Sequence, residues 1–284
     1  MRIGFLGPQG TFTHFACKKA NEQLKSAWEL VEFQSLDRLF DALDDQTVDA
    51  IFSPLENSIE GPVNRVLDGL INHPECEISH VFDMPIQQSL LSFSRDIKLD
   101  QVKHIVSMPH AIAQCFTFIK HNCPHAKFHH SSSTAGAIPL VDALQLPRES
   151  TVIIGHHGIV DFFPIHIREK SIHDQKHNKT QFCLIQKSKY TNSQEIQHGL
   201  IAFSTPKDKP GSLLSVLELF KVANINLTKI LSRPKKSEVG AYVFFIEFSI
   251  DSATLSSIDL LSQVKRKCLF FKELGYYRSQ DLDD

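Results

Sequence analysis

Residues 50–61 read Ala50-Ile51-Phe52-Ser53-Pro54-Leu55-Glu56-Asn57-Ser58-Ile59-Glu60-Gly61. The short apolar run at the start predicts a buried strand of a parallel sheet, which should end at Ser53 because Pro54 cannot donate a sheet hydrogen bond. A carboxylate, an amide, a hydroxyl and a glycine follow. Open α/β sheets bind ligands at the carboxyl ends of their strands. The stretch therefore predicts an α/β fold with a ligand site here, while an ordinary polar loop explains the same residues.

The same alternation continues on both sides of this stretch, as far as about residue 187. Alternating strands and amphipathic helices predict parallel sheets with crossover helices. The expected strands are 3–6, 32–33, 50–53, 78–83, 88–94, 104–107, 127–129, 151–155 and 181–186, and the expected helices are 13–24, 36–44, 62–73, 109–121, 134–144 and 158–161.

The pattern also predicts how the chain is divided. Residues 1–187 should form two lobes, the first from about 1–83 and 161–187 and the second from about 84–160, with a small-molecule cleft between them. The polar, non-periodic stretch 188–198 is typical of a linker. Residues 199–276 then show the order strand, helix, strand, strand, helix, strand, which is the ferredoxin-like βαββαβ arrangement.

Composition excludes several classes of function. The 284 residues are 42% hydrophobic and 22% charged, as in an ordinary globular protein with a sizeable core. The formal net charge of -2 gives no electrostatic reason to expect nucleic acid or a membrane surface as a partner. No apolar run approaches the roughly 18–20 residues of a membrane span. The chain opens with a strand and not with a signal-peptide pattern, so a cytoplasmic location is expected.

The cysteines and histidines do not form a metal or disulfide pattern. None of the six cysteines belongs to a Cys-x-x-Cys pair, and buried apolar positions suit them better. The adjacent pairs His129-His130 and His156-His157 would point to opposite faces of a strand, so neither pair can easily share one ion. We expect neither a metal site nor a disulfide.

Four polar segments at expected strand ends are candidates for the site. Residues 7–13 combine glycines with a helix start, which favours a carboxylate over a nucleotide because no phosphate-loop motif is present. Thr13 as a helix N-cap explains the same segment. The segments 107–114 and 130–137 also open helices, and helix capping explains each of them equally well. In the segment 178–182, Thr180 could donate a proton or hydrogen bond, while a turn before a strand is the alternative.

Together these segments resemble the prephenate dehydratase family over nearly the whole chain. The family's Gly-Pro-x-Gly-Thr-Phe-Ser/Thr matches residues 7–13, and its Pro-x-Glu-Asn-Ser/Thr matches residues 54–58. Its Ser-x-Pro-x-x-x-x-Gln matches Ser107, Pro109 and Gln114, and its Ser/Thr-Ala-rich segment matches residues 132–137. Residues 209–213, 224–230, 232–234 and 242–246 resemble the ACT regulatory domain of the family. The resemblance implies a bilobal, periplasmic-binding-protein-like α/β catalytic domain with parallel or mixed sheets, followed by a ferredoxin-like ACT domain.

The activity implied by this resemblance is that of a carbon-oxygen lyase in L-phenylalanine biosynthesis. Prephenate would lose carbon dioxide and water to give phenylpyruvate, without a metal or organic cofactor. Thr180 would act at the ring hydroxyl, Asn57, Ser107 and Gln114 would orient the substrate, and Glu56 would join that network or hold its loop. The substrate-binding residues implied are Gly10, Thr11, Phe12, Ser58, Ser132, Ser133, Thr134, Gln181 and Phe182.

The resemblance also implies regulation. ACT domains of the family pair across subunits and bind phenylalanine as a feedback inhibitor, so a homodimer or homotetramer is expected. The residues implied are Gly211, Ser212, Leu213, Asn226 and Leu227. A domain that serves only for dimerisation is the alternative.

Two departures from the family pattern keep other functions open. Gln181 stands where the family has arginine, and an amide cannot replace a guanidinium as a two-point carboxylate partner. Leu231 stands where the family has glutamate before Ser-Arg-Pro. The alternatives are an arogenate dehydratase, a non-aromatising prephenate decarboxylase, which Thr180 argues against, and a catalytically silent amino-acid sensor. A further alternative is a solute-binding protein of the periplasmic type. The missing signal-peptide pattern and the C-terminal domain both argue against it.

Overall fold

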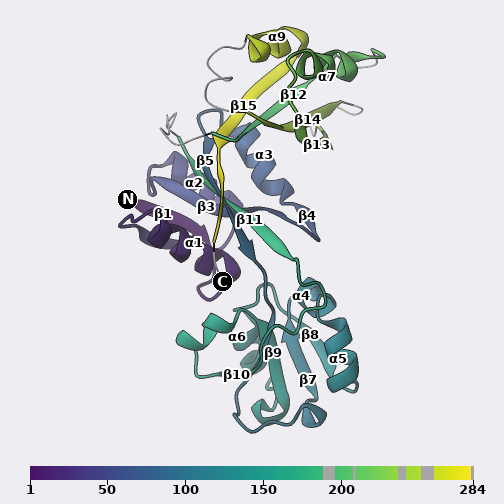
Figure 1. Ribbon diagram of the computed structural model, residues 1–284. Coiled ribbons are helices and arrows are strands. Elements are labelled where there is room, and N and C mark those ends of the chain that lie inside the picture. The colour runs from purple at the N-terminus through teal and green to yellow at the C-terminus, as the bar shows by residue number, and fades with distance from the viewer. Residues whose placement is uncertain (188–195, 207–208, 236–240, 251–258, 283–284) are drawn as a thin grey trace.

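In the computed structural model, three units are arranged in a row along the molecule (Figure 1). The structure describes residues 1–187, 196–206, 209–235, 241–250 and 259–282. Two sheets organise these residues, one of eleven strands and one of five. None of the described helices is long and apolar enough to cross a membrane. The prediction of an α/β fold with mixed sheets is confirmed, while the exact domain limits stay a prediction.

The first lobe is built on the parallel strands β2, β1 and β3, followed by β11 and β5. Strand β11 runs antiparallel to both of its neighbours, so the sheet is mixed. Phe52 and Phe182 stack between strands in the core, with ring centroids 5.7 Å apart. The elements are β1 (Arg2–Leu6), α1 (Phe12–Gln23), β2 (Glu29–Phe33), α2 (Leu36–Asp44), β3 (Ala50–Asn57), β4 (Gly61–Pro62), α3 (Asn64–Asn72), β5 (Glu77–Pro85) and β11 (Lys179–Gln186).

The prediction that β3 ends at Ser53 is wrong. The strand continues through Pro54 to Asn57. Phe182 of β11 lies opposite Pro54 and Gln181 lies opposite Glu56, so Leu55 is the extra residue of a bulge. Bulges are among the few places in a sheet that tolerate proline, because local pairing is already interrupted. The extension carries Asn57 alongside Thr180, its partner in the register.

The second lobe holds the five-stranded sheet, in the order β10-β6-β9-β7-β8. Strand β10 pairs antiparallel with β6 and was not expected from the sequence. Helix α6 begins at Ala137 and not at Thr134, and the expected helix 158–161 is a 3-10 turn. The elements are β6 (Ser89–Ser92), η1 (Leu99–Gln101), β7 (His104–Ser107), α4 (Pro109–Ala113), α5 (Phe116–Asn122), β8 (Lys127–His130), α6 (Ala137–Ala143), η2 (Arg148–Ser150), β9 (Thr151–Gly155), η3 (His157–Asp161) and β10 (His166–Glu169).

The single helix expected over 109–121 is two helices, α4 and α5, with a break at Gln114 and Cys115. The carbonyl oxygen of Gln114 accepts the N–H of Asp174 at 2.7 Å. The Asp174 carboxylate in turn accepts the N–H of Thr117 at 3.1 Å, in the first turn of α5. A contact from a distant segment therefore replaces the bonds that would continue the helix, which single-sequence periodicity cannot reveal.

The C-terminal unit, residues 196–277 as far as they are described, confirms the ferredoxin-like prediction. Its antiparallel strands lie in the order β13-β14-β12-β15, with α7 and α9 in contact with each other. The sequence predicts the second helix of this unit over 255–268. Helix α9 begins at Leu260, and residues 255–258 lie outside the described part of the chain. The elements are β12 (His198–Ser204), α7 (Ser212–Val222), β13 (Leu227–Pro234), β14 (Tyr242–Ser249), α9 (Leu260–Lys267) and β15 (Phe270–Tyr277).

The C-terminal unit shares its sheet with the first lobe. Gly275 of β15 pairs with Ile78 of β5, and strand β16 (Ser279–Asp281) then runs parallel to β5. Gly275 has φ +147°, and a Cβ there would lie 2.2 Å from the carbonyl oxygen of Ile78, so only glycine fits this junction. The chain after the expected end of the ACT domain thus returns to the first lobe, as the yellow strand in Figure 1 shows.

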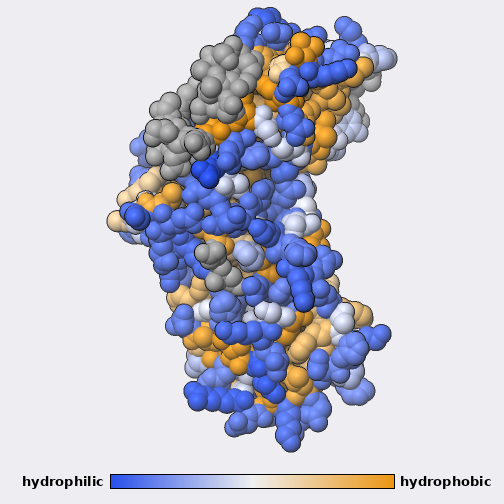
Figure 2. All heavy atoms as spheres, in the orientation of Figure 1, coloured by the Kyte–Doolittle hydropathy of each residue, from blue (hydrophilic) through white to orange (hydrophobic). Residues whose placement is uncertain are grey.

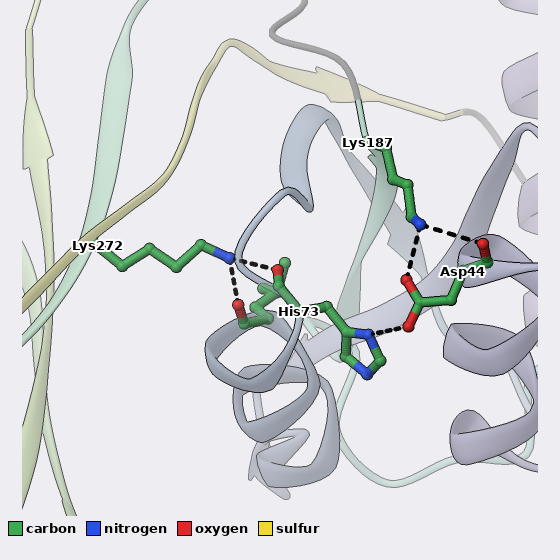
Figure 3. A network of polar contacts seen from close by, with 5 residues as sticks. Asp44, His73, Lys187 and Lys272 are labelled. Carbon is green, nitrogen blue, oxygen red and sulfur yellow. Dashed lines mark hydrogen bonds and ion pairs between the residues drawn. The ribbon is translucent and has the colours of Figure 1, made fainter.

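Two cations of the C-terminal unit hold helix α3. Lys272 Nζ donates to the carbonyl oxygens of His73 and Cys76, at 2.7 and 3.0 Å, and also to that of Leu70. Figure 3 shows Lys272 reaching the end of the helix beside His73. A positive charge at the carboxyl end of a helix satisfies orphan carbonyls and complements the helix dipole. At the other end, Arg233 donates to the carbonyl oxygen of Asn64 at 2.6 Å. Helix α3 therefore stays fixed relative to the C-terminal unit.

Lys272→Met is expected to destabilise the protein by about 2–3 kcal/mol, because three partly buried carbonyl groups lose a charged donor. The ammonium of Lys272 is partly removed from water, and this burial lowers its pKa below the ordinary value of 10.5. Urea unfolding measures the change. Lys267→Met, on the exposed end of α9, is the control. Equal unfolding midpoints for the two variants would contradict this role of Lys272.

Candidate active site

A cavity of about 470 Å³ lies between the two lobes, at the carboxyl end of β3 and beside the chain crossings. Both lobes contribute to its wall, as the bilobal prediction requires. The predicted site residues that line it are Thr11, Phe12, Asn57, Gln114, Ser132, Ser133, Thr134, Thr180 and Phe182.

Asn57 and Thr180 form the centre of the polar wall. Asn57 Oδ1 accepts the backbone N–H groups of Ile59 and Glu60, at 2.9 and 3.0 Å. This Asx turn fixes the orientation of the amide, because a backbone N–H can only donate. Asn57 Nδ2 then donates to Thr180 Oγ1 at 2.9 Å. Thr180 is 8% exposed, and its oxygen is held as an acceptor, so its own hydroxyl proton is available to a group in the cavity.

A chain of amides continues from this pair into the second lobe. Asn57 Nδ2 also donates to Asn178 Oδ1 at 2.8 Å, and Asn178 Nδ2 donates to Gln114 Oε1 at 3.3 Å. Gln88 Nε2 donates to the same Gln114 oxygen at 3.2 Å. Two donors on Gln114 Oε1 leave its amide nitrogen as the group it can offer elsewhere. The network links the lobes and orients every amide in it.

The loop before α1 contributes a helix amino end to the cavity. Thr11 is the N-cap of α1 and accepts the N–H of His14 at 3.4 Å, so the prediction of Thr13 as the cap is wrong. Burial, with Lys18 nearby, lowers the pKa of His14 to about 4. The neutral ring can therefore accept the N–H of Gly10 at neutral pH, at 3.1 Å. Thr11, Phe12 and Thr13 line the cavity where the first N–H groups of the helix lack helical partners.

The second lobe contributes the serine-rich loop before α6. Ser132, Ser133 and Thr134 line the same cavity as the amino end of α1. Ser133 Oγ accepts the N–H of Gly136 at 2.9 Å, so part of this loop's polarity serves to shape the helix start. The N-cap of α6 is Gly136, without a side-chain capping bond, so of the two alternatives that the sequence presents the structure shows the position in the cavity wall.

Five predicted residues lie outside the cavity wall. Glu56 forms an ion pair with Lys229 of β13, and Gln181, opposite Glu56 in the register, shares that face of the sheet. Side chains alternate along a strand, so Gln181 points away from the face that carries Thr180 and Phe182.

The other three predicted residues outside the wall have structural contacts. Ser107 is fully buried and donates to the carbonyl oxygen of Ile154 at 2.7 Å. Ser58 accepts the N–H of Lys179 at 3.0 Å, and Gly10 packs against Ile159.

Two members of the amide network, Gln88 and Asn178, were not assigned a role from the sequence, although Asn178 opens the candidate segment 178–182. They are 2% and 3% exposed, although glutamine and asparagine are rarely buried without a partner. The signal in the sequence was a glutamine two residues before the apolar pair Leu90-Leu91, at the crossing between lobes. His110 and Glu60 also line the cavity and were not expected.

The electrostatics of the cavity come mainly from neutral dipoles. Among the described residues that line it, none is a lysine or arginine, and Glu60 is the one carboxylate. Amides, hydroxyls and the amino end of α1 can stabilise an anion without a formal positive charge. The arrangement suits a small polar molecule with acidic groups and one reacting polar substituent.

The predicted effector residues divide between two places. Gly211, Ser212 and Leu213 line a cavity of about 700 Å³ beside the start of α7, together with Tyr242 and Phe244. Asn226 and Leu227 lie at the start of β13, where Asn226 accepts the N–H of Ser249 at 2.9 Å. They are not part of the wall of that cavity within this chain.

Comparison with known proteins gives a consistent result. A family model described as prephenate dehydratase matches residues 3–190. The prephenate dehydratase of Methanocaldococcus jannaschii is 31% identical over 271 residues, covering 95% of each chain. That of Bacillus subtilis is 31% identical over 255 residues, covering 87% of this chain and 88% of the relative. A crystal structure of prephenate dehydratase from Arthrobacter aurescens in complex with L-Phe superposes with a TM-score of 0.85 at 26% identity, covering 98% of this chain and 90% of that one.

Proposed function

This chain belongs to the prephenate dehydratase family, and from that membership we propose that it converts prephenate to phenylpyruvate, carbon dioxide and water in L-phenylalanine biosynthesis. The observation that carries the proposal is the fixed orientation of Asn57, which leaves the Thr180 proton available in the cavity. The reaction is driven by aromatisation of the ring, so the enzyme needs to hold the substrate and assist loss of the hydroxyl. No group of the cavity has to form a covalent bond with the substrate.

The bond changes define what the site must do. The bond from the ring to its carboxylate breaks, the electron pair enters the ring, and the carbon–oxygen bond to the hydroxyl breaks. One proton is taken up, finally from water, so that the hydroxyl leaves as water. Thr180 donates a hydrogen bond or delivers this proton at the hydroxyl oxygen. Because a threonine hydroxyl is a weak acid, the proton that it delivers must be replaced from water, so that the hydroxyl leaves as water and not as hydroxide.

The carboxylates of prephenate require hydrogen-bond donors. We assign the amino end of α1, at Thr11, Phe12 and Thr13, to one of them, because helix N–H groups and the helix dipole favour an anion. The Gln114 amide nitrogen and the hydroxyls of Ser132, Ser133 and Thr134 are further donors in the same wall. Glu56 and Gln181 act outside the cavity in this assignment, at the contact with Lys229. The replacement of the family arginine by Gln181 then removes no direct substrate contact.

The test is a stopped assay for phenylpyruvate with prephenate and arogenate supplied side by side. Turnover of prephenate supports the proposal. Turnover of arogenate alone would indicate an arogenate dehydratase. Binding of prephenate without formation of phenylpyruvate would indicate a catalytically silent sensor. The comparisons support neither the sensor nor a solute-binding protein, since the relatives named above are prephenate dehydratases.

We further propose that phenylalanine is the effector. The relative from Arthrobacter aurescens was crystallised with L-Phe, and the present chain has a cavity at Gly211, Ser212 and Leu213 of the corresponding unit. Aromatic side chains Tyr242 and Phe244 in the same wall suit an apolar ring. A homodimer or homotetramer and a cytoplasmic location stay predictions from the sequence.

Exposed apolar side chains favour pairing through the C-terminal unit. Val222 is 85% exposed, Leu214 58% and Ile230 51%, and Ile230 lies on β13, an edge strand of the sheet. Hydrophobic residues gather on this unit at the upper right of Figure 2, while much of the rest of the visible face is hydrophilic. Exposed apolar patches and open sheet edges are common sites of association between chains.

Gly211→Ala is expected to raise the half-inhibitory concentration of phenylalanine about fivefold or more, because alanine disfavours positive φ by roughly 1–2 kcal/mol. Gly211 has φ +80°, and a Cβ added there would have no neighbour within 4 Å. Alanine would therefore strain the backbone without a steric clash. Inhibition curves on prephenate turnover measure the effect, with Lys267→Ala as the control. Turnover without phenylalanine should not change. Superposable curves would place the effector elsewhere, and flat wild-type activity up to millimolar phenylalanine would remove the effector role.

A further inference from the structure

Gln88, a residue of the cavity wall, carries a buried acceptor without a partner. The residue is 2% exposed, lines the cavity, and its Oε1 is a buried oxygen for which the described residues supply no hydrogen-bond partner. Most buried polar atoms in folded proteins are paired, and one left unpaired costs about 1–3 kcal/mol. An unpaired acceptor on a residue that lines a ligand cavity points to a donor on the ligand.

The orientation of Gln88 follows from the network. Ile59 and Glu60 fix Asn57, Asn57 Nδ2 fixes the oxygen of Asn178, and Asn178 Nδ2 donates to Gln114 Oε1. With Gln114 Oε1 set as an acceptor, the group of Gln88 that faces it must be Nε2. The oxygen of Gln88 is therefore the free atom, and it cannot be exchanged with the nitrogen without breaking this chain of bonds.

The chemistry of the substrate identifies the donor. At neutral pH prephenate carries two carboxylates and a ketone, which only accept hydrogen bonds. Its ring hydroxyl is the one group that can donate. We propose that Gln88 Oε1 accepts the hydrogen bond of this hydroxyl, an assignment that rests on prephenate being the substrate. The hydroxyl oxygen then receives its second hydrogen from the side of Thr180, and both hydrogens of the departing water have a partner.

This contact strengthens during the reaction. As the hydroxyl takes up a proton and becomes water, its O–H becomes a stronger donor, and Gln88 Oε1 stabilises the transition state more than the ground state. The contact also discriminates between substrates, because a buried acceptor is left unpaired when the hydroxyl is missing. Gln88 is accordingly a substrate-binding residue at the leaving group.

Gln88→Met keeps the length of the side chain and removes the acceptor. We expect kcat/KM for prephenate to fall about tenfold to a hundredfold, mainly in kcat, as for the loss of one buried hydrogen bond in a transition state. Gln186→Met is the matched control, since Gln186 is a buried glutamine of β11 that is not part of the cavity wall. Equal kcat/KM in both variants and the wild type would overturn the proposal.

A double-mutant cycle separates a direct contact from support of Gln114. If Gln88 acted only by holding Gln114, Gln88→Met would cost nothing further in a Gln114→Met enzyme. We expect a further loss of at least about threefold, which corresponds to most of a kcal/mol. No further loss would make Gln88 a positioning residue for Gln114 and overturn the contact with substrate.

A prephenate analogue that lacks the ring hydroxyl gives the specific readout. Its inhibition constant should be the same for wild type and Gln88→Met, because the analogue has no donor for Gln88 to accept. A loss of analogue affinity in the variant equal to the loss in kcat/KM would indicate general damage and contradict the proposal. If the variant does not fold, the wild type still decides: binding the analogue as tightly as prephenate would show that the hydroxyl meets no partner. A wild type without phenylpyruvate production would instead refute the proposed function itself.

Discussion

Thr180→Val is expected to lower kcat for phenylpyruvate formation by about 10²–10⁴, the usual contribution of a positioned proton donor. Valine has the shape of threonine, so the core around Phe182 and the pairing of β11 with β3 should persist. What is lost is the hydroxyl that Asn57 holds at 2.9 Å and whose proton is available to the cavity. KM should change little, because the carboxylates bind through other groups. Stopped assays and single-turnover measurements on prephenate give kcat.

Two variants control this experiment. Thr180→Ser keeps the hydroxyl and should retain most of the activity. Thr151→Val removes another buried threonine hydroxyl, one that donates to the carbonyl oxygen of Pro147 at 2.7 Å outside the cavity. A Thr180→Val enzyme with kcat within threefold of wild type would place the proton donor elsewhere, and the role of the Asn57–Thr180 pair would have to be abandoned.

Asn57→Asp should lower kcat/KM by at least about 10², because it reverses the direction of a hydrogen bond at the reacting group. One aspartate oxygen can still accept the N–H groups of Ile59 and Glu60, so the turn survives. The other oxygen replaces Nδ2, and a carboxylate can only accept. Thr180 then donates its proton to position 57 and not to the substrate. The new negative charge also opposes a dianionic substrate.

Asn21→Asp is the matched control for this change. Asn21 Oδ1 accepts the N–H of Trp28 at 3.2 Å near the far end of α1, so aspartate preserves the bond and adds the same charge outside the cavity. Steady-state kinetics and thermal unfolding should be measured for both variants. If Asn57→Asp keeps wild-type kcat/KM, the hydrogen-bond direction inferred for the whole amide network is wrong, and with it the orientation of Gln88.

Much of the fold was predictable because it depends on local patterns. Period-two apolar runs, helical periodicity and turn residues gave the α/β lobes and the βαββαβ order of the C-terminal unit. The predictions that were wrong share a cause, which is contact with a segment far away in the sequence. The break at Gln114 depends on Asp174, sixty residues later in the chain, and the extension of β3 through Pro54 depends on a bulge opposite β11. Strand β16 forms only because β5 offers an edge partner.

The candidate site shows the same division. Motifs indicated Asn57, Gln114 and Thr180, and these three do line one cavity. The sequence also grouped Glu56 with Asn57 and Gln181 with Thr180, since they are neighbours in the chain. In a strand, neighbours point to opposite faces, and the register places Glu56 and Gln181 together on the face toward Lys229. Whether a residue faces substrate depends on this register.

The sequence by itself determined the types of groups available and the order of the elements, because both follow from local composition and periodicity. Only the tertiary structure decided which way each amide points. That direction begins with two backbone N–H groups at Ile59 and Glu60 and passes through Asn57, Asn178 and Gln114 to Gln88. The physical reason is that an amide has a donor end and an acceptor end, and a single partner of fixed polarity is enough to orient a whole connected network.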